Sequence, residues 1–275
     1  MKLLYSLFII TFLFPSLSNQ NKNRTKNFPK EELQVKHFPK KENVWVFLMA
    51  GQSNMAGRGF VEPKDTIPNT RVITINVKDD VIYAKEPLHF YEPTMAGLDI
   101  GKSFGEELIK HIPDSITVLL IPTAVGGSKI EKWINDENFR KVRLFSNFEE
   151  KLKLAENYGE VKGILWHQGE SNTSNKNSIN AYENNLSLLI SKFRKIAKNN
   201  QLPVIIGELG SYSENKDQWN AINSKIISVS KTDSLIGLVR TQDLTDRGDN
   251  VHFNSKSIRL LGKRYAKKFM EVSPN

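Results

Sequence analysis

The chain has 275 residues, of which 39% are hydrophobic and 25% are charged, and its formal net charge is +9. This composition is ordinary for a globular protein, and a chain of this length can bury the core of one large α/β domain. Cysteine is absent, which excludes disulfides, thiolate catalysis and cysteine-ligated zinc. We expect no nucleic-acid partner, because no aromatic and basic motif accompanies the positive charge.

The first 18 residues have the pattern of a secretory signal peptide. Lys2 supplies a positive charge, an apolar run follows over Leu3–Phe14, and small residues surround Leu17 at the end. The apolar run is short for a bilayer span. We therefore expect a signal peptide over 1–18, a secreted or periplasmic protein, and no stable membrane insertion after cleavage. An uncleaved anchor is the alternative.

Residues 19–43 differ in composition from the rest of the chain. They hold seven lysine or arginine residues against three glutamates and show no apolar periodicity. Such a segment cannot bury much apolar surface, so we expect a flexible basic leader. Residues 44–275 contain no internal repeat and no second boundary, which predicts a single domain.

Short apolar runs alternate with helical patterns along this domain. Six runs predict strands, at Val44–Met49, Val72–Ile75, Ile116–Ile121, Val161–Trp166, Val204–Ile206 and Leu235–Val239. The runs are mostly continuous, as in parallel strands that are covered on both faces. Apolar residues between them recur at helical spacing, most clearly over 182–197. This alternation predicts an α/β fold, a three-layer α/β/α sandwich around a doubly wound parallel sheet.

Functional residues of such a fold gather beyond the carboxyl ends of the strands. The first strand runs into a turn bounded by Gly51 and Gly57, with Ser53 at its tip. Serine is a weak nucleophile on its own and needs a base and donors for an oxyanion. A base and oxyanion donors must therefore come from other parts of the chain.

Asp249 and His252 are the strongest candidates for the base and the carboxylate that orients it. Across a turn, this spacing puts the carboxylate beside one ring nitrogen and leaves the other nitrogen to face the serine. An Asp that caps the following helix beside an incidental His is the alternative. Three rivals remain open, namely His167 as the base and Asp243 or Asp246 as the orienting carboxylate.

Ester hydrolysis also needs hydrogen-bond donors for the developing oxyanion. The backbone N–H groups around Ser53 are one source. The Gly126-Gly127 pair after the strand at 116–121 is a second, because glycine lets the backbone approach a ligand closely. The side-chain amide of Gln168, after the strand at 161–166, is a third.

These segments together resemble a known superfamily. Gly51–Met55 resembles the first block of the SGNH hydrolases, and more narrowly the sialate O-acetylesterase-like and carbohydrate esterase family 6 branch. Gly126–Ser128 resembles that branch's second block. Trp166–Asn172 resembles the third, where the usual Gly-x-Asn-Asp gives way to a Gln-Gly-Glu pattern, and Asp249–Phe253 resembles the closing block. The resemblance covers about residues 44–270.

The resemblance implies an SGNH/flavodoxin-like fold with about five parallel strands, and neither a metal nor a cofactor. It implies Ser53 as nucleophile, His252 as base and Asp249 as the orienting residue. The implied oxyanion donors are the Ser53 backbone, Gly127 in preference to Gly126, and Gln168. Candidate substrate-binding residues are Gln52, Asn54 and Glu170, with a supporting hydrogen-bond role favoured for Glu170.

The expected function is that of a secreted serine esterase that hydrolyses O-acetyl esters on a carbohydrate, of the acetylxylan or sialate type, through an acetyl-enzyme. A lipid or aryl esterase on the same fold is one alternative, since a fold does not fix the substrate. A non-catalytic glycan-binding surface protein is another. Arg58, Lys129 and Arg247 are candidate contacts for an acidic sugar, although solvated surface charge is the simpler interpretation of each.

Overall fold

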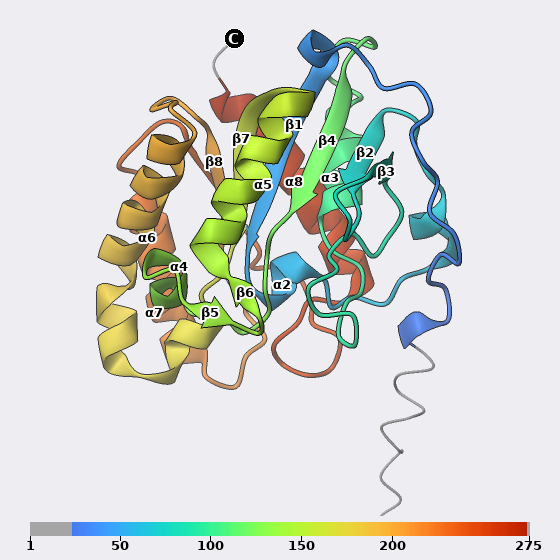
Figure 1. Cartoon of the computed structure of the whole chain (residues 1–275). Coiled ribbons are helices and arrows are strands. Elements are labelled where there is room, and N and C mark those ends of the chain that lie inside the picture. The colour runs from blue at the N-terminus through green and yellow to red at the C-terminus, as the bar shows by residue number, and fades with distance from the viewer. Residues whose placement is uncertain (1–23, 274–275) are drawn as a thin grey trace, which may run out of the picture.

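The structure is a computed structural model that describes residues 24–273. The predicted signal peptide lies outside this range. A central seven-stranded sheet has the order β3-β2-β4-β1-β7-β8-β9 (Figure 1). Its strands are β1 (Val44–Gly51), β2 (Val72–Ile75), β3 (Val81–Tyr83), β4 (Thr117–Pro122), β7 (Glu160–His167), β8 (Val204–Gly207) and β9 (Ile236–Val239). All neighbouring pairs are parallel except β2 and β3.

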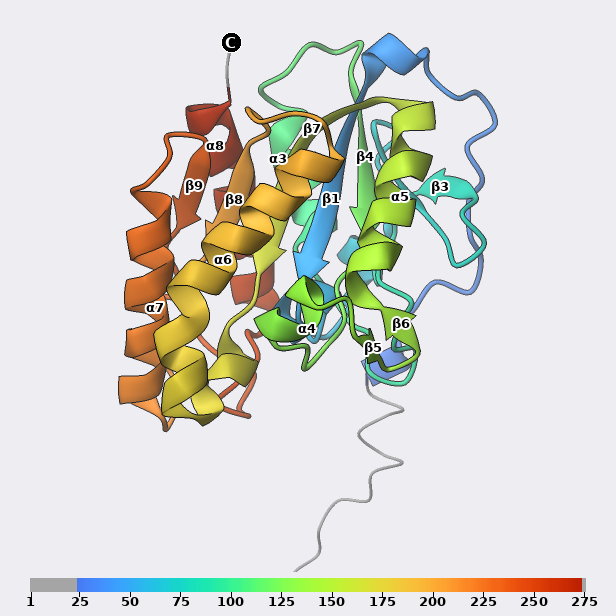
Figure 2. The same ribbon diagram turned by 60° about the vertical axis from the view of Figure 1, so that its left-hand side comes forward.

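Helices cover both faces of the sheet. The helices are α2 (Ser53–Ala56), α3 (Gly101–Leu108), α4 (Ile130–Ile134), α5 (Leu144–Tyr158), α6 (Lys176–Ile196), α7 (Lys216–Ser230) and α8 (Ser255–Val272). Short 3₁₀ turns lie at Lys41–Asn43, Pro63–Thr66 and Glu170–Ser174. Buried residues of α4 to α7 share one core cluster, and those of α3 and α8 share another (Figure 2). The predicted three-layer α/β/α fold is therefore confirmed.

The central strand β1 explains why the layers form. Its side chains alternate between the two clusters, with Val46 and Leu48 on one face and Phe47 and Met49 on the other, and all four are fully buried. Phe47 packs edge-on against Phe104 of α3 and Phe269 of α8, with ring centroids 4.8 Å apart in each case. A strand that is apolar on both faces is stable only when helices cover both of them.

The sheet is larger than expected. All six predicted strands are present, but the sheet has seven strands rather than about five. The seventh, β3, has three residues, and only Ile82 among them is buried. A small hairpin of β5 (Asn138–Phe139) and β6 (Val142–Arg143) was also not predicted. Strands this short carry too little apolar pattern to stand out from a loop.

Residues 24–43 run along the β3 edge of the sheet instead of standing free. Val35 donates its backbone N–H to Val81 at 3.3 Å, and Tyr83 donates to Leu33 at 2.8 Å. Phe28 packs against the core cluster of α3 and α8. An edge strand leaves backbone groups that need partners, and this segment supplies them. Part of the predicted leader, residues 19–23, lies outside the described residues, and the flexibility of the segment 19–43 stays a prediction.

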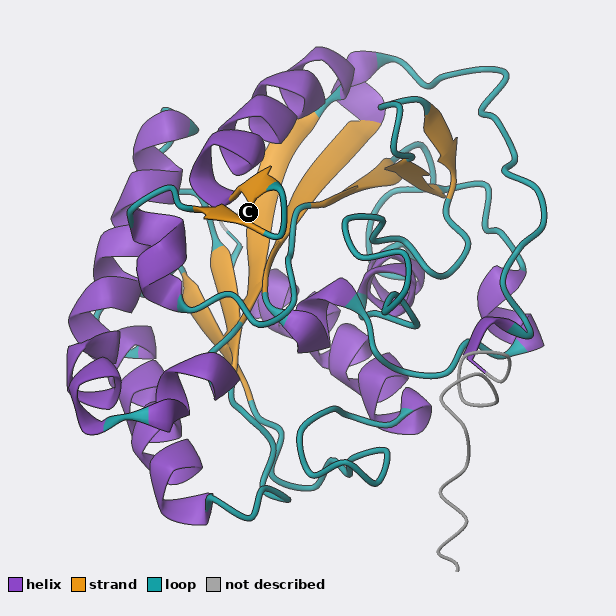
Figure 3. Cartoon of the chain, turned by 60° about the horizontal axis from the view of Figure 1, so that its bottom comes forward, coloured by secondary structure: helices purple, strands orange, loops and turns teal. Residues whose placement is uncertain are grey.

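The loops that follow the strands gather at the carboxyl edge of the sheet. Figure 3 turns this edge toward the viewer and draws the loops in teal. At the centre of the sheet, β1 lies beside β7. The two strands pair along their length, from Trp45 opposite Glu160 to Gly51 opposite His167 at the carboxyl edge. Within the described range, no helix is long and apolar enough to cross a membrane.

Candidate active site

A glycine lets the turn after β1 pack closely against the backbone of β7. Gly51 has φ 137°, and a Cβ atom there would lie 2.1 Å from the backbone oxygen of His167. Only glycine fits this close approach in this conformation. The next residue, Gln52, donates its backbone N–H to the same His167 oxygen at 3.0 Å. Ser53 then begins α2 at the carboxyl edge of the sheet, with 6% of its surface exposed.

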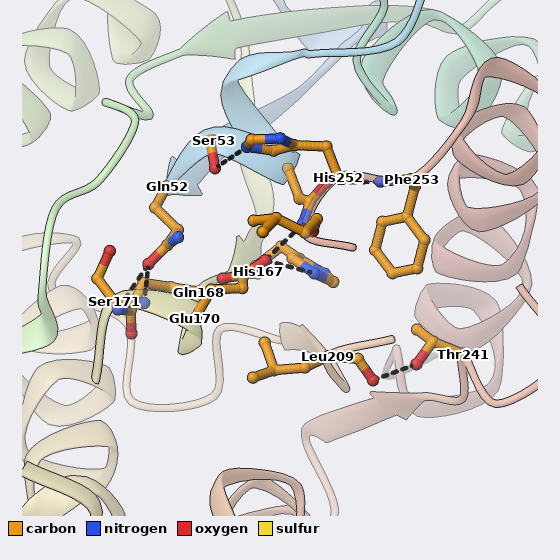
Figure 4. Close-up of polar contacts among 12 residues, drawn as sticks. Gln52, Ser53, His167, Gln168, Glu170, Ser171, Leu209, Thr241, His252 and Phe253 are labelled. Atoms are coloured by element: carbon orange, nitrogen blue, oxygen red, sulfur yellow. Dashed lines mark hydrogen bonds and ion pairs between the residues drawn. The ribbon is translucent and has the colours of Figure 1, made fainter. Parts of the chain in front are cut away.

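Ser53, His252 and Asp249 form one hydrogen-bonded chain. His252 Nε2 lies 2.9 Å from Ser53 Oγ (Figure 4), and His252 Nδ1 lies 2.8 Å from Asp249 Oδ2. A carboxylate only accepts, so Nδ1 carries the proton and Nε2 is free to accept one from the hydroxyl. Asp249 Oδ1 also accepts the backbone N–H of His252 at 2.7 Å. The structure thus brings Ser53 to His252 and Asp249 across about 200 positions of sequence, in the arrangement that serine hydrolysis requires.

Burial, helped by two nearby arginines, keeps the imidazole of His252 neutral. Burial raises the pKa of Asp249, but hydrogen bonds from His252 and Arg247 outweigh burial and hold it well below its usual range. Burial lowers the pKa of His252, and the positive charges of Arg247 and Arg58 lower it further against the opposing effect of Asp249. A neutral imidazole at neutral pH is the form that can accept the serine proton.

The rival residues do not reach this chain. His167 is fully buried, and its Nδ1 lies 3.1 Å from the hydroxyl of Tyr265. Burial lowers the pKa of His167 to about 3. Asp243 forms an exposed ion pair with Arg264 at 2.7 Å. Asp246 accepts the backbone N–H groups of Gly248 and Asn250, each at 2.8 Å, and so shapes the loop that carries Asp249.

The backbone N–H groups of the two glycine-bounded turns differ in whether they already have an acceptor. Gly126 donates its N–H to Glu92 Oε2 at 2.5 Å, so this donor is occupied. Gly127 has φ 78°, and neither its N–H nor that of Ser53 has an acceptor among residues 24–273. The N–H of Gly127 is therefore the better candidate for an oxyanion donor, because the N–H of Gly126 is already bonded to Glu92. The sequence alone does not reveal this contact.

Gln168 lies behind Gln52 and not beside Ser53 (Figure 4). Its Nε2 is within 3.1 Å of Gln52 Oε1, 3.2 Å of the Ser128 carbonyl and 2.7 Å of Asn172 Oδ1. The side chain is fully buried, and internal acceptors occupy both amide hydrogens. This arrangement differs from the prediction that Gln168 itself donates to the oxyanion.

Asn54 holds the loop on both sides of His252. Its Nδ2 donates to the carbonyl of Val251 at 3.1 Å, and its Oδ1 accepts the N–H of Phe253 at 3.1 Å. The same Nδ2 donates to Glu170 Oε1 at 2.5 Å. Asn54 is 1% exposed and Glu170 is 8% exposed. The contacts of Asn54 and Glu170 are internal to the protein, and their predicted substrate-binding role stays a prediction.

Glu170 gives the site a testable pH signature. Burial raises its pKa to about 7, against the hydrogen bond from Asn54. The folded chain therefore keeps a proton that the unfolded chain releases at lower pH, and this residue lowers the free energy of unfolding as pH rises from about 4.5 to about 7. Glu170→Gln has no proton to lose in this range. As pH rises from about 4.5 to about 7, the free energy of unfolding of the variant should therefore rise by about 3 kcal/mol relative to that of wild type, at about 1.4 kcal/mol for each pKa unit.

Urea denaturation of both proteins at pH 4.5 and pH 7.5 measures this difference. Glu156→Gln, an exposed position on α5, is the matched control and should show no such gain. A constant difference between Glu170→Gln and wild type across the range would contradict the raised pKa.

The basic side chains near the site are mostly engaged. Arg58 is 3% exposed and pairs with Glu92 at 2.8 Å. Arg247 contacts Asp249 at 2.7 Å and the backbone oxygen of Arg58 at 2.7 Å, and Lys129 Nζ lies 3.1 Å from Ser174 Oγ. These contacts make Arg58 and Arg247 supports of the loops rather than free sugar contacts.

Arg140, on the unpredicted β5–β6 hairpin, reaches the glycine turn. It also pairs with Glu92, and one of its terminal nitrogens lies 3.6 Å from where a Gly127 Cβ would be. Its side chain is 41% exposed. No pattern in the sequence around the hairpin indicated this contact. Among the residues described, no group of three or more His, Cys, Asp or Glu could hold a metal ion.

The chain matches known proteins over nearly its whole described length. A family model described as "Carbohydrate esterase, sialic acid-specific acetylesterase" matches residues 43–271. A curated relative named "Probable carbohydrate esterase" from Arabidopsis thaliana is 28% identical over 245 residues, which is 82% of this chain and 90% of the relative.

Solved structures share the fold. The structure of an Arabidopsis thaliana protein has TM-score 0.73 at 24% identity, over 83% of this chain and 98% of that one. NanS has TM-score 0.67 at 16% identity, over 85% and 98%. A carbohydrate acetylesterase from Xanthomonas citri has TM-score 0.64 at 17% identity, over 84% and 56%. The resemblance found in the sequence is confirmed: the chain belongs to the sialic acid-specific acetylesterase family of carbohydrate esterases, which are carboxylic ester hydrolases.

Proposed function

We propose that this protein is a secreted or periplasmic serine esterase that removes O-acetyl groups from a carbohydrate through an acetyl-enzyme. The observation that carries the proposal is the chain of contacts from Ser53 Oγ through His252 to Asp249, at 2.9 Å and 2.8 Å. Export rests on the signal-peptide pattern of residues 1–18, and an extracytoplasmic chain that begins at residue 19 would support it.

The first half of the reaction forms the acetyl-enzyme. Ser53 Oγ attacks the acetyl carbonyl carbon while His252 Nε2 takes the hydroxyl proton. The carbonyl oxygen becomes an oxyanion that accepts hydrogen bonds from the N–H groups of Ser53 and Gly127. The C–O bond to the sugar then breaks, and His252 gives its proton to the departing sugar oxygen. Asp249 stabilises the imidazolium throughout but remains ionised.

The second half returns the enzyme to its starting state. A water molecule gives a proton to His252 and attacks the acetyl carbon, so that a second oxyanion forms at the same donors. Collapse breaks the bond to Ser53 Oγ, releases acetic acid and returns the proton from His252 to the serine.

Acetate release from a substrate panel tests the proposal. The panel holds acetylated xylan, O-acetylated sialic acid, p-nitrophenyl acetate and p-nitrophenyl octanoate, each with wild type and Ser53→Ala. Release from an acetylated sugar that the variant loses would support the proposal and identify the sugar class. Preference for the octanoate would favour a lipid esterase. A folded wild type that releases acetate from none of these substrates would contradict the proposal.

The acidic limb of the pH profile should depend on Arg247. The charge of Arg247 lowers the pKa of His252, and activity needs the neutral imidazole. Arg247→Met removes that charge, so the His252 pKa should rise and the acidic limb of kcat/KM should move to higher pH. Arg264→Met, which loses an exposed ion pair elsewhere, should leave the limb in place. A shift of the Arg247→Met limb to lower pH would contradict the proposed base.

A further inference from the structure

The side-chain amide of Gln52 is held at one end only. Its Oε1 accepts hydrogen bonds from Gln168 Nε2 and from the backbone N–H of Ser171, each at 3.1 Å. Its Nε2 has no acceptor among residues 24–273, although the side chain is only 2% exposed. The Nε2 atom itself is not completely buried. This largely buried side chain therefore carries an unused donor that keeps some exposed surface.

The polarity of this amide is dictated by backbone groups. The N–H of Ser171 can only donate, so the atom that faces it must be the Gln52 oxygen. The carbonyl of Ser128 can only accept, so the atom of Gln168 that lies 3.2 Å from it must be the nitrogen. The two amides thus fit together in one orientation, with Gln168 donating to Gln52. A flipped Gln52 would put its NH₂ against two donors.

The free nitrogen lies on the side of Ser53. In Figure 4 the Gln52 oxygen is turned to Gln168 and Ser171, and the nitrogen is the amide atom nearer to Ser53. Gln52 is also the residue immediately before Ser53, on the turn that Gly51 pins to β7. The nitrogen is therefore carried by the same short segment as the nucleophile.

We propose that Gln52 Nε2 is the side-chain donor to the oxyanion, beside the N–H groups of Ser53 and Gly127, and that Gln168 is the positioning residue that aims it. This inference rests on the proposed function, because an oxyanion forms only if Ser53 attacks an ester. An amide that is fixed before the reaction costs no reorganisation when the charge develops, and such a donor acts strongly where water is excluded. Gln168 contributes by holding the Gln52 oxygen and not by touching the substrate.

Paired ester substrates test the donor directly. The probes are p-nitrophenyl acetate and its thionoester, in which C=S replaces C=O and accepts hydrogen bonds poorly. Gln52→Met keeps the length of the side chain and removes the donor. We expect kcat on the oxoester to fall by about 10²- to 10³-fold with little change in KM. The ratio of oxoester to thionoester rates should fall by a similar factor, which a purely structural role of Gln52 would not produce.

Further variants keep the test decisive. Gln52→Glu retains oxygens for Ser171 and Gln168 and lacks the donor, so it should show the same loss even if Gln52→Met is unstable. Gln168→Met should lower kcat less than Gln52→Met does, because the donor remains but is no longer held. Gln201→Met, at an exposed position, is the matched control and should match wild type.

The outcomes separate this inference from the proposed function. Wild-type kcat and an unchanged oxoester to thionoester ratio in both Gln52 variants, with Ser53→Ala inactive, would overturn the inference and leave the proposed function standing. A collapse of the ratio only in Gln168→Met would also overturn it, because Gln168 would then be the donor. A folded wild type that hydrolyses no ester would overturn both.

Discussion

Replacement of Ser53 by alanine is expected to reduce the rate of ester hydrolysis by about 10⁴- to 10⁶-fold, as loss of the nucleophile does in other serine hydrolases. The variant loses the hydroxyl oxygen that lies 2.9 Å from His252 Nε2. The oxyanion donors and the imidazole remain, so the residual rate would come from water attacking a bound ester.

The same change should leave the fold intact. Among residues 24–273 the Ser53 hydroxyl hydrogen-bonds to His252 alone, and alanine is smaller than serine and fits the start of α2. Ser224→Ala on the exposed surface of α7 is the matched control and should have wild-type activity. Thermal unfolding should be cooperative in both variants. Retained acetate release by Ser53→Ala, in a sample free of contaminating esterase, would refute the serine mechanism.

The fold was largely predictable because its strands are buried on both faces. The continuous apolar runs at 44–49 and 161–166 form β1 and β7. These two strands pair up to Gly51 and His167, directly before Gln52 and Gln168. Buried parallel strands leave this pattern in the local sequence, and the helices between them leave another. The contacts among Ser53, His252 and Asp249 were predictable for a related reason, since each residue follows a strand or precedes a helix where chain direction fixes its place.

The parts that were missed depend on contacts between distant residues. Val35 and Val81 pair across an edge that neither segment predicts, because β3 has only three residues and the segment before β1 shows no apolar periodicity. Arg140 likewise reaches the distant Glu92 from a hairpin of two-residue strands. Local propensity says little about such contacts, which tertiary packing selects.

The roles of the amides in the site show the same limit. Residue type alone makes Gln168 a good oxyanion donor, and the resemblance points to it. Which amide faces the substrate depends on Ser128 and Ser171, whose backbone groups lie 40 and 119 positions from their partners in the chain. A short motif identifies the amides but not the order in which they bond.

Replacement of Asp249 by asparagine is expected to lower kcat by about 10⁴-fold, the loss seen when the orienting carboxylate of a triad becomes an amide. All the neighbours of this carboxylate are donors. Oδ1 accepts backbone N–H groups from Val251 at 3.0 Å and His252 at 2.7 Å. Oδ2 accepts from Arg247 Nε at 2.7 Å and His252 Nδ1 at 2.8 Å.

An asparagine must point its NH₂ group at one of these two pairs of donors. Facing the imidazole, the NH₂ selects the tautomer with hydrogen on Nε2, and His252 can no longer accept the proton of Ser53. If the NH₂ faces the backbone N–H groups of Val251 and His252 instead, donors meet donors. The repulsion displaces the loop and moves His252 away from Ser53. Either arrangement removes the base, so kcat should fall while the affinity for substrate changes little.

Kinetics on p-nitrophenyl acetate measure the effect, with Asp243→Asn and Asp246→Asn as matched controls from the same loop region. Asp243 pairs with Arg264 at the surface, and its loss should leave kcat near the wild-type value. Asp246 shapes the loop through Gly248 and Asn250, so its variant should lose less activity than Asp249→Asn does. If Asp249→Asn kept wild-type activity while either control lost it, the orienting role would pass to that residue, and the contact at 2.8 Å would be incidental to catalysis.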